Sequence, residues 1–585
     1  MTTAALSRWL PGSLVVLATL ALFAWTVSFP LLDWDDHLNI SENRLVNPPS
    51  PGGLLVLWAR PYAGLYVPAT YTLWSAEAAL AAETPTGGDP HPLDARVFHF
   101  GNVLLHAANA WLVWLLLVRI VRSPWGAAAG ALLFALHPLQ VESACWVTET
   151  KGLLCGCFGF WALLIFERFV GQWSARRSPG QSAKPRRAAL VFLYAGAAAL
   201  FLLAMLAKPA AVALPLVAWL IATWTARETA NSPGGVRIAA ALVPWLALAL
   251  GVALVTRNVQ GAESFVQPTI WWQRPVVAAD AVAFYLYKLV IPLNLAPDYG
   301  RSPDWLLASN WVWITWLLPV ALAVALCLRR VPPVWRRAGW ISLGLLLPVL
   351  GLVPFAFQRF STVADRYAYL AMLGPAIVVA AFAGRTRRRA AHIAIAALLL
   401  LCGVRSAAQT RHWRSNAALF AQAVSVNPTS TVALNGLGNV HSRQEEWNLA
   451  LDFYRRAVTA DPNNASSYFN LGRAELALDR PQRAIESFAR ALELRPGYHK
   501  VREPYALALV AVQRVDDAGA QLLALVAAEP DNAVAWENLG RIRAFQGRRA
   551  EAIEHLEHAL EINPRLESAR QELQRLTTGP SATPP

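Results

Sequence analysis

The sequence predicts an all-α protein made of a polytopic helical membrane domain over residues 1–410 and a helical repeat domain over residues 411–577. Two observations predict this fold class. Apolar residues make up 56% of the 585 residues and charged residues only 15%, which is too apolar for a chain of soluble domains. Prolines in the last third recur every 34 residues, which indicates stacked two-helix units.

The membrane domain begins with an apolar segment at residues 11–30, which has no charge over the ~20 residues that a spanning helix needs. We expect this segment to be a retained anchor, because no A-x-A-like cleavage site follows it. The further candidate spans are residues 97–118, 125–147, 152–170, 188–207, 209–226, 236–256, 276–296, 311–328, 338–357, 366–383 and 390–404.

Arginines between these segments predict how the chain crosses the membrane. Basic loops favour the cytoplasm, and those up to residue 256 fall on one side if every segment crosses. The later arginines stay on that side only if residues 276–296, which contain Asp280 and Lys288, form a re-entrant or interfacial helix. We therefore expect eleven crossings in a membrane such as the bacterial inner membrane, with the repeats on the periplasmic side.

The basic excess does not indicate nucleic-acid binding. Residues 1–427 contain 33 Lys and Arg against 17 Asp and Glu, whereas residues 428–585 contain 18 against 20. The net charge of +14 therefore arises in the membrane half, where basic loops set orientation. We expect no nucleic-acid partner.

A cluster of acidic residues follows the first span directly, in a predicted external loop over residues 31–96. Asp35, Asp36 and His37 lie at the membrane boundary, where an ionised carboxylate is costly unless it is solvated, paired or used in chemistry. A carboxylate with a raised pKa there could accept the proton of an attacking hydroxyl during glycosyl transfer. These three are the predicted catalytic residues; a helix cap or a solvated loop is the simpler alternative.

Two further clusters should share that membrane face. Residues 137–151 contain His137, Glu142, Glu149 and Lys151 at the external end of the third span. A cationic set could neutralise a lipid-phosphate leaving group, because guanidinium and ammonium groups bind phosphate oxygens. Its members are Lys208, Arg359 and Arg366, and snorkelling to lipid headgroups is the alternative reading for Lys208 and Arg366. Asp365 could simply pair with Arg366.

The repeats have the tetratricopeptide period, with prolines at residues 428, 462, 496, 530 and 564. Four units are expected near residues 431–464, 465–498, 499–532 and 533–566. Gly438, Gly472 and Gly540 should lie where the first helices pack closest, and the third unit is degenerate. A half unit at 411–428 and a final helix near 565–577 would cap the array, followed by a disordered tail at 578–585. Stacked units form a groove for a peptide.

Several motifs together resemble a known family. DWDDHLNI, VFHFGNVLLHAANAWLVWLLL, LHPLQVESACWVTETKGLL, LAKPAAVALP, VIPLNLAPDYG and STVADRYAYLAMLG occur in order before the repeats. This series resembles the transmembrane and tetratricopeptide-repeat-containing O-mannosyltransferases and their bacterial relatives. The resemblance implies a GT-C glycosyltransferase that uses a polyprenyl-phosphate sugar. It matches Asp35 and Asp36 to the family's acidic pair and Arg366 to its phosphate-side arginine. His137 and Glu142 match its second external motif, with Tyr367 and Tyr369 as further substrate contacts.

The leading hypothesis is transfer of a hexose, with mannose the candidate sugar, from a polyprenyl-phosphate donor to Ser or Thr hydroxyls of an exported protein held by the repeats. A non-catalytic membrane anchor for a repeat scaffold in envelope assembly is the alternative, and a GT-C enzyme with a non-protein acceptor is a third. The sequence has no Walker, dinucleotide, G-x-S-x-G or H-E-x-x-H motif, which disfavours a soluble nucleotide donor. We expect no cofactor besides the lipid-linked donor and predict no metal ligands; metal dependence stays open.

Overall fold

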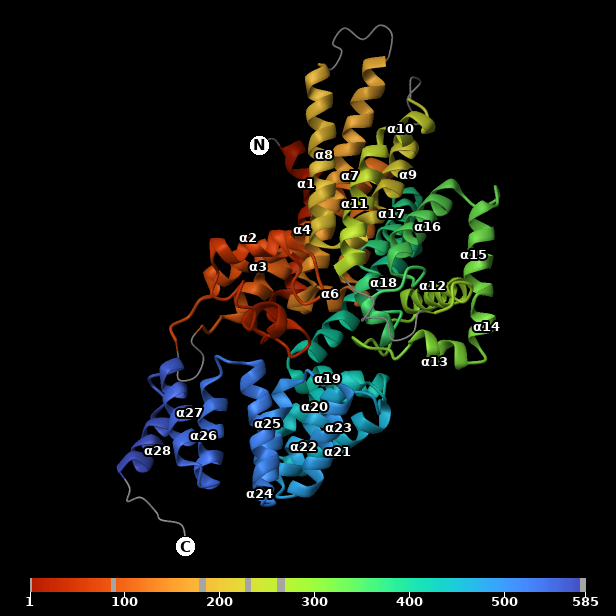
Figure 1. The fold of residues 1–585 in the computed structure, drawn as a ribbon. Helices are drawn as coiled ribbons and strands as arrows, with labels where there is room; N and C mark the ends of the chain where they lie inside the picture. The colour runs from red at the N-terminus through yellow and green to blue at the C-terminus, as the bar shows by residue number, and fades with distance from the viewer. Residues whose placement is uncertain (1–2, 86–90, 178–185, 227–232, 260–268, 579–585) are drawn as a thin grey trace. The chain divides into compact units, whose positions relative to one another are not determined.

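The computed structural model describes residues 3–85, 91–177, 186–226, 233–259 and 269–578, and these residues form helices joined by short turns. The chain forms two compact units, Met1–Asn427 and Pro428–Pro585 (Figure 1). The all-α prediction is confirmed. The predicted tail at 578–585 lies outside the described residues from position 579 onward.

The first unit contains nineteen of the described α-helices. Their bounds are α1 Thr3–Phe23, α2 Pro51–Ala59, α3 Pro68–Ala81, α4 Ala95–Val121, α5 Pro124–Leu136, α6 Val141–Cys145, α7 Thr150–Arg177, α8 Arg187–Ala207, α9 Leu214–Ala226, α10 Gly235–Ala241, α11 Val243–Val259, α12 Arg274–Val290, α13 Pro303–Ala308, α14 Val312–Thr315, α15 Leu317–Cys327, α16 Pro333–Leu346, α17 Leu373–Arg385, α18 Arg389–Thr410 and α19 Asn416–Val426.

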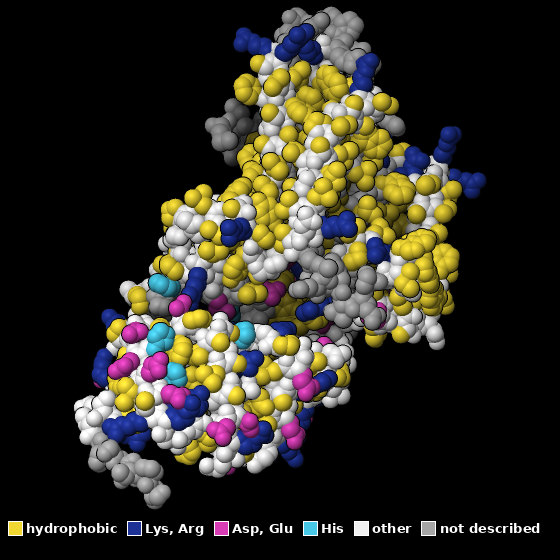
Figure 2. Space-filling model, in the orientation of Figure 1, with side chains coloured by type: hydrophobic (Ala, Val, Ile, Leu, Met, Phe, Trp, Pro, Cys, Tyr) yellow, Lys and Arg dark blue, Asp and Glu magenta, His cyan; other side chains and the backbone are white. Residues whose placement is uncertain are grey.

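Apolar side chains cover the outside of this unit. Figure 2 shows hydrophobic side chains over α8 and its neighbours, with Lys and Arg gathered at one end. Large side chains there are strongly exposed, including Val191, Phe192 and Leu250. A soluble protein would not leave so much apolar surface open to water, whereas lipid would cover it. The first unit is therefore a membrane unit.

The number of crossings stays a prediction. Within the described ranges, six helices are long and apolar enough to cross a membrane, or seven if the bent pair α10 and α11 counts as one span. Three helices are shorter than the spans predicted for them: α5, α15 and α17 have 13, 11 and 13 residues. Figure 1 draws α12 crosswise to α7 and α8, the arrangement expected of an interfacial or re-entrant helix.

The second unit is a stack of helix pairs. Its helices are α20 Thr431–Arg443, α21 Trp447–Ala460, α22 Ala465–Ala477, α23 Pro481–Leu494, α24 Arg502–Ala511, α25 Val515–Ala528, α26 Ala533–Phe545, α27 Arg549–Ile562 and α28 Glu567–Thr578. The predicted glycines lie at close contacts between the two helices of a pair: a Cβ at Gly438 would come within 2.3 Å of the Tyr454 ring, and one at Gly472 within 2.7 Å of Phe488. The helix pairs fall within the four predicted ranges, and α28 overlaps the range of the predicted final helix.

The predicted half unit at residues 411–428 belongs mainly to the first unit, so the division lies later than the predicted residue 411. Its helix α19 packs on the acidic segment. Asn416 accepts a hydrogen bond from the Asp33 amide at 2.8 Å, and the Phe420 ring lies 6.0 Å from that of Trp34. This helix therefore supports the loop that follows the first span.

Candidate functional site

Close packing of α5 against α17 brings two distant segments together. Gly126 of α5 faces Ala380 and Gly384 of α17, and a Cβ at Gly130 would lie 2.2 Å from the carbonyl oxygen of Ala376. Small residues four apart let two membrane helices approach closely. Because Gly126 near the start of α5 meets the end of α17, the two helices run antiparallel. The segment after α5 therefore meets the segment before α17.

The meeting point is an ion pair between Glu142 and Arg366. Arg366 Nη1 lies 2.5 Å from Glu142 Oε1, and the Arg366 amide donates to Oε2 at 3.0 Å. Their side chains are only 2% and 6% exposed. Burial raises the pKa of Glu142, and the Arg366 charge opposes that shift. The simpler reading that Asp365 pairs with Arg366 is wrong, because Asp365 accepts a hydrogen bond from the Tyr299 hydroxyl at 2.7 Å instead.

Aromatic rings surround the Arg366 guanidinium. Its Cζ lies 4.2 Å from the ring centre of Phe357, 5.0 Å from Tyr367 and 5.3 Å from Trp146. Cation–π contacts at these distances attract the guanidinium to the rings. Trp146 also donates from Nε1 to the Trp34 carbonyl at 2.7 Å. One indole thus connects the arginine to the acidic segment.

Asp36 is fully buried and acts as an anchor. Its Oδ1 accepts from the Thr148 amide at 2.9 Å and the Thr148 hydroxyl at 2.6 Å, and its Oδ2 accepts from the Leu32 amide at 2.9 Å. Burial raises the pKa of Asp36 to about 6, and these hydrogen bonds limit the rise. Because the protein supplies all three donors, the Asp36 carboxylate connects the segment that follows the first span to residues 147–149.

Asp35 is placed differently although it is the next residue. Its side chain is exposed, and its carboxylate makes no hydrogen bond or ion pair within the described part of the chain. Its φ of 70° lies in the left-handed region, which non-glycine residues seldom adopt. Residues held in such a backbone conformation cluster at functional sites. The amide and side chain of Asn39 both donate to the Asp35 carbonyl, at 3.0 and 2.9 Å, and fix this turn.

His37 lies at the edge of the same turn. Its Nε2 is 3.3 Å from Asp33 Oδ1, and its Nδ1 is 2.8 Å from the Ser41 hydroxyl. The hydrogen bond with Asp33 raises the pKa of His37. Its side chain is 40% exposed, so it can exchange protons with the solvent at this edge.

Two lysines join the cluster through Glu149. Lys208 Nζ lies 2.7 Å from Glu149 Oε2, and Lys151 Nζ lies 3.7 Å from Oε1. The Lys208 ammonium also lies 6.0 Å from the Tyr367 ring centre, and that of Lys151 lies 5.5 Å from Trp146. Asp35 interacts electrostatically with Lys151. Three cations, Lys151, Lys208 and Arg366, therefore converge where two buried glutamates only partly balance them.

Some predicted residues lie elsewhere. The Tyr369 hydroxyl bonds with His106 and Asn109, both at 2.9 Å, inside the helix core. His137 Nε2 lies 3.1 Å from the Leu289 carbonyl oxygen, and burial lowers the pKa of His137 to about 4. Arg359 is exposed, and its guanidinium lies 4.4 Å from the Phe360 ring centre. These contacts of the three side chains are with residues other than Trp146, Glu142 or Arg366.

Trp146 and Thr148 are the contacts that sequence reasoning missed. Both lie inside the motif of residues 137–151, but an aromatic residue near a membrane boundary is usually an interfacial anchor. Only the structure shows that Thr148 of this segment pairs with Asp36, 112 residues away. No signal within the single sequence could have indicated that pairing.

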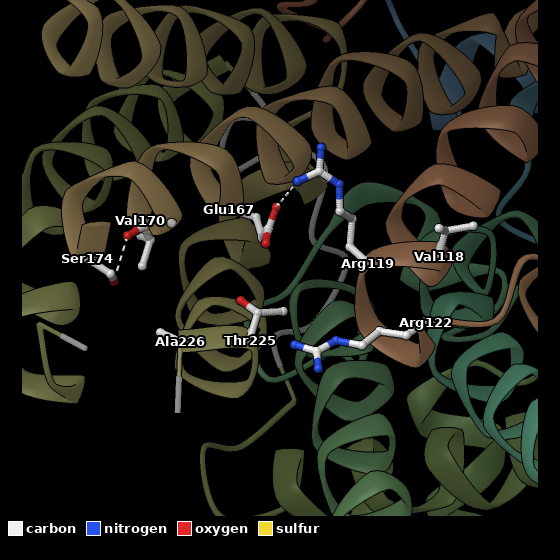
Figure 3. A pocket seen from close by; sticks show the side chains of 9 residues that line it. Val118, Arg119, Arg122, Glu167, Val170, Ser174, Thr225 and Ala226 are labelled. Carbon is white, nitrogen blue, oxygen red and sulfur yellow. Dashed lines mark hydrogen bonds and ion pairs between the residues drawn. The ribbon is translucent and has the colours of Figure 1, made fainter. Parts of the chain in front are cut away.

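A separate cavity of about 350 Å³ lies at the other end of α4 and α7. Figure 3 shows Arg119 and Arg122 among the side chains that line it, with the ion pair between Arg119 and Glu167, whose atoms are 2.9 Å apart. Its lining includes none of the predicted site residues. It lies at the end of α4 opposite to residues 95–102, which face the acidic segment.

Comparisons with known proteins agree with both units. Tetratricopeptide-repeat family models match residues 429–496 and 533–566. Protein O-mannosyl-transferase Tmtc3 of Drosophila melanogaster is 23% identical over 69% of this chain, and human Protein O-mannosyl-transferase TMTC3 is 22% identical over 68%. The chain is therefore similar to the transmembrane and tetratricopeptide-repeat O-mannosyltransferases in both its membrane unit and its repeats.

The chain spans about half the length of these curated relatives, 50% of the fly protein and 46% of the human one. Among solved structures, the crystal structure of YrrB, a TPR protein with an unusual peptide-binding site, is 24% identical. That alignment covers 33% of this chain and 95% of YrrB with a TM-score of 0.25.

Proposed function

We propose that the chain is a membrane glycosyltransferase that moves a hexose, with mannose the candidate, from a polyprenyl-phosphate donor to Ser or Thr hydroxyls of an exported protein. The observation that carries this proposal is the cluster around Trp146. In this cluster Lys151 interacts electrostatically with the exposed Asp35, and Glu142 and Glu149 only partly neutralise Lys151, Lys208 and Arg366. Its membrane relatives are named as protein O-mannosyl-transferases.

Asp35 is the proposed base. Transfer to a hydroxyl needs a carboxylate that can reach the hydroxyl proton as the anomeric carbon develops positive charge. Asp35 is exposed, whereas all hydrogen bonds to Asp36 come from the protein. Asp36 therefore positions the loop, and Asp35 contacts the acceptor.

Lys151, Lys208 and Arg366 are the proposed groups that stabilise the phosphate leaving group. Breaking the bond between the sugar and the phosphate leaves negative charge on the phosphate oxygens, and fixed cationic donors stabilise it. Lys151 and Lys208 share Glu149, and Arg366 is held by Glu142 and three rings. In the proposal, the exported acceptor reaches this site while the repeat groove holds it on the periplasmic side of a bacterial inner membrane.

The proposal is tested by intact-mass analysis of exported proteins from cells with and without the chain. We expect hexose increments on some of these proteins with wild-type chain, and a loss of at least ~100-fold with Asp35→Asn, because a general base contributes about 10²–10⁴ in rate. Glu83→Gln is the matched control, since Glu83 is an exposed acid in the same external loop.

The alternative of a non-catalytic scaffold predicts a different result. If the chain only anchors repeats for envelope assembly, Asp35→Asn would leave exported masses and envelope assembly unchanged. If a well-folded Asp35→Asn variant gives normal hexose increments, Asp35 is not the base.

A further inference from the structure

A large apolar cavity lies beside the candidate site. It has a volume of about 760 Å³, within the range of sites that enclose small molecules, and lies among α5, α12, α15, α16, α17 and α18. Four side chains with strongly polar groups line it. Three of these are bonded within the protein: His137 with the Leu289 carbonyl, Tyr285 with Ala364, and Ser342 with the Ala371 carbonyl.

The fourth polar side chain is Arg405 of α18. Its Nε is buried and has no hydrogen-bond partner, and no carboxylate pairs with Arg405 within the described ranges. A guanidinium in an apolar wall is costly unless an anion accompanies it. The cavity therefore combines a long apolar lining with one cation that lacks an anion.

The cation lies at the end of the cavity near the candidate site. The next residue, Ser406, donates to the Leu136 carbonyl at 2.8 Å, at the end of α5. Two turns further along, the ring of Trp413 lies 6.2 Å from that of Trp146. The cavity extends in the other direction along α18 to Leu398 and to Trp335 of α16, toward the arginine-rich end of these helices. The cavity thus has a charged end near the acidic segment and an apolar remainder. A lipid in the non-cytoplasmic leaflet has the same arrangement, with its phosphate near the acidic segment and its chain in the membrane.

The cavity and the candidate site share a wall. Ala368 lines the cavity, and Arg366, two residues earlier, binds Glu142. The Tyr285 hydroxyl donates to the Ala364 carbonyl at 3.1 Å and fixes the start of the same segment. This shared wall favours the lipid consumed at the site over bulk phospholipid.

We propose that this cavity binds the prenyl chain of the lipid carrier and that Arg405 binds its phosphate. This inference rests on the proposed function and names the residue and cavity that hold its lipid. Arg405 is a binding residue for the carrier on its way into and out of the cluster around Trp146. The phosphate supplies the anion that Arg405 lacks, and the chain fills the apolar volume.

The test measures binding of undecaprenyl monophosphate to the purified full-length chain by native mass spectrometry. Undecaprenol, which lacks the phosphate, and phosphatidylglycerol, a bulk anionic phospholipid, are the comparison ligands. We expect the monophosphate to bind at least ~10-fold more tightly than either, because a charged hydrogen bond to an arginine contributes about this much.

Two variants locate the binding. Arg405→Gln should weaken monophosphate binding by ~10-fold or more, and Val379→Trp should weaken it by filling the cavity, in which Val379 is a half-buried lining residue. Arg389→Gln is the matched control, because Arg389 is exposed at the opposite end of the same helix. Thermal melting of each variant checks folding, and Arg405→Lys, which keeps the charge, should retain part of the affinity.

Three results would overturn the inference: wild-type affinity in a folded Arg405→Gln variant, equal binding of undecaprenol, or equal binding of phosphatidylglycerol with the same dependence on Arg405. The measurement needs no acceptor and no turnover, so it is separate from the proposed function. Predicted binding together with normal hexose transfer by Asp35→Asn would contradict the proposed base only. If the wild-type chain transfers hexose but Arg405→Gln binds the monophosphate with wild-type affinity, only this inference is contradicted.

Discussion

At the scale of single residues, two adjacent aspartates have opposite surroundings. The sequence predicts that the Asp35 and Asp36 pair matters, because charges at a membrane boundary need a reason. It cannot say which one is enclosed, since that depends on Thr148 donating twice to Asp36. The same limit applies to Arg366, whose partner is Glu142, 224 residues away, rather than its neighbour Asp365.

The buried Asp36 makes stability depend on pH. Its pKa is raised from 3.8 to about 6, so the folded chain holds this proton more tightly than the unfolded chain. Stability from this group is present below pH ~4 and is lost as the pH rises through ~6, by up to about 3 kcal/mol. We expect the melting temperature of the purified chain to fall between pH 4 and pH 7 and Asp36→Asn to reduce that slope.

His37 is the control for this pH dependence. The pKa of His37 is also raised, so it adds a change of the same sign, and His37→Gln should leave the Asp36 part in place. An Asp36→Asn variant with the wild-type slope would show that Asp36 is not the titrating group.

At the scale of elements, the packing of α5 on α17 sets the geometry of the site. The apolar stretches of these helices could be predicted from the sequence, but their ends could not. Residues 125–147 form α5 and then short helical turns after Leu136, because Pro138 interrupts the span. Residues 366–372 precede α17 as separate turns, which frees Arg366 to meet Glu142.

A bulky residue at Gly130 should separate these two helices. A Cβ there would lie 2.2 Å from the Ala376 carbonyl oxygen, so Gly130→Leu must displace backbone. We expect a loss of several degrees in melting temperature and at least ~10-fold less hexose transfer, since overpacking costs about 1–3 kcal/mol and moves the ion pair. Gly196→Leu on α8 is the matched control, because no atom lies within 4 Å of a Cβ at Gly196. Equal effects of the two substitutions would contradict this account.

At the scale of the whole molecule, the repeats could be predicted almost completely and the membrane unit only in outline. A fixed 34-residue period makes each helix pair a copy of the next, so Gly438 and Gly472 fall at equivalent contacts. The membrane helices have no such period. Their order along the chain does not reveal that Trp146, Lys208 and Arg366 meet, because each lies between different helices.

The central claim is that the acidic loop and the repeats face the same side of the membrane, opposite the arginine-rich loops. The direct measurement is labelling of single cysteines, in a background without the native ones, by a thiol reagent that cannot cross the inner membrane. The account predicts that Gly52→Cys and Asn463→Cys react in cells with a permeable outer membrane, and that Arg387→Cys reacts only after lysis. Labelling of Arg387→Cys but not Asn463→Cys in intact cells would contradict it.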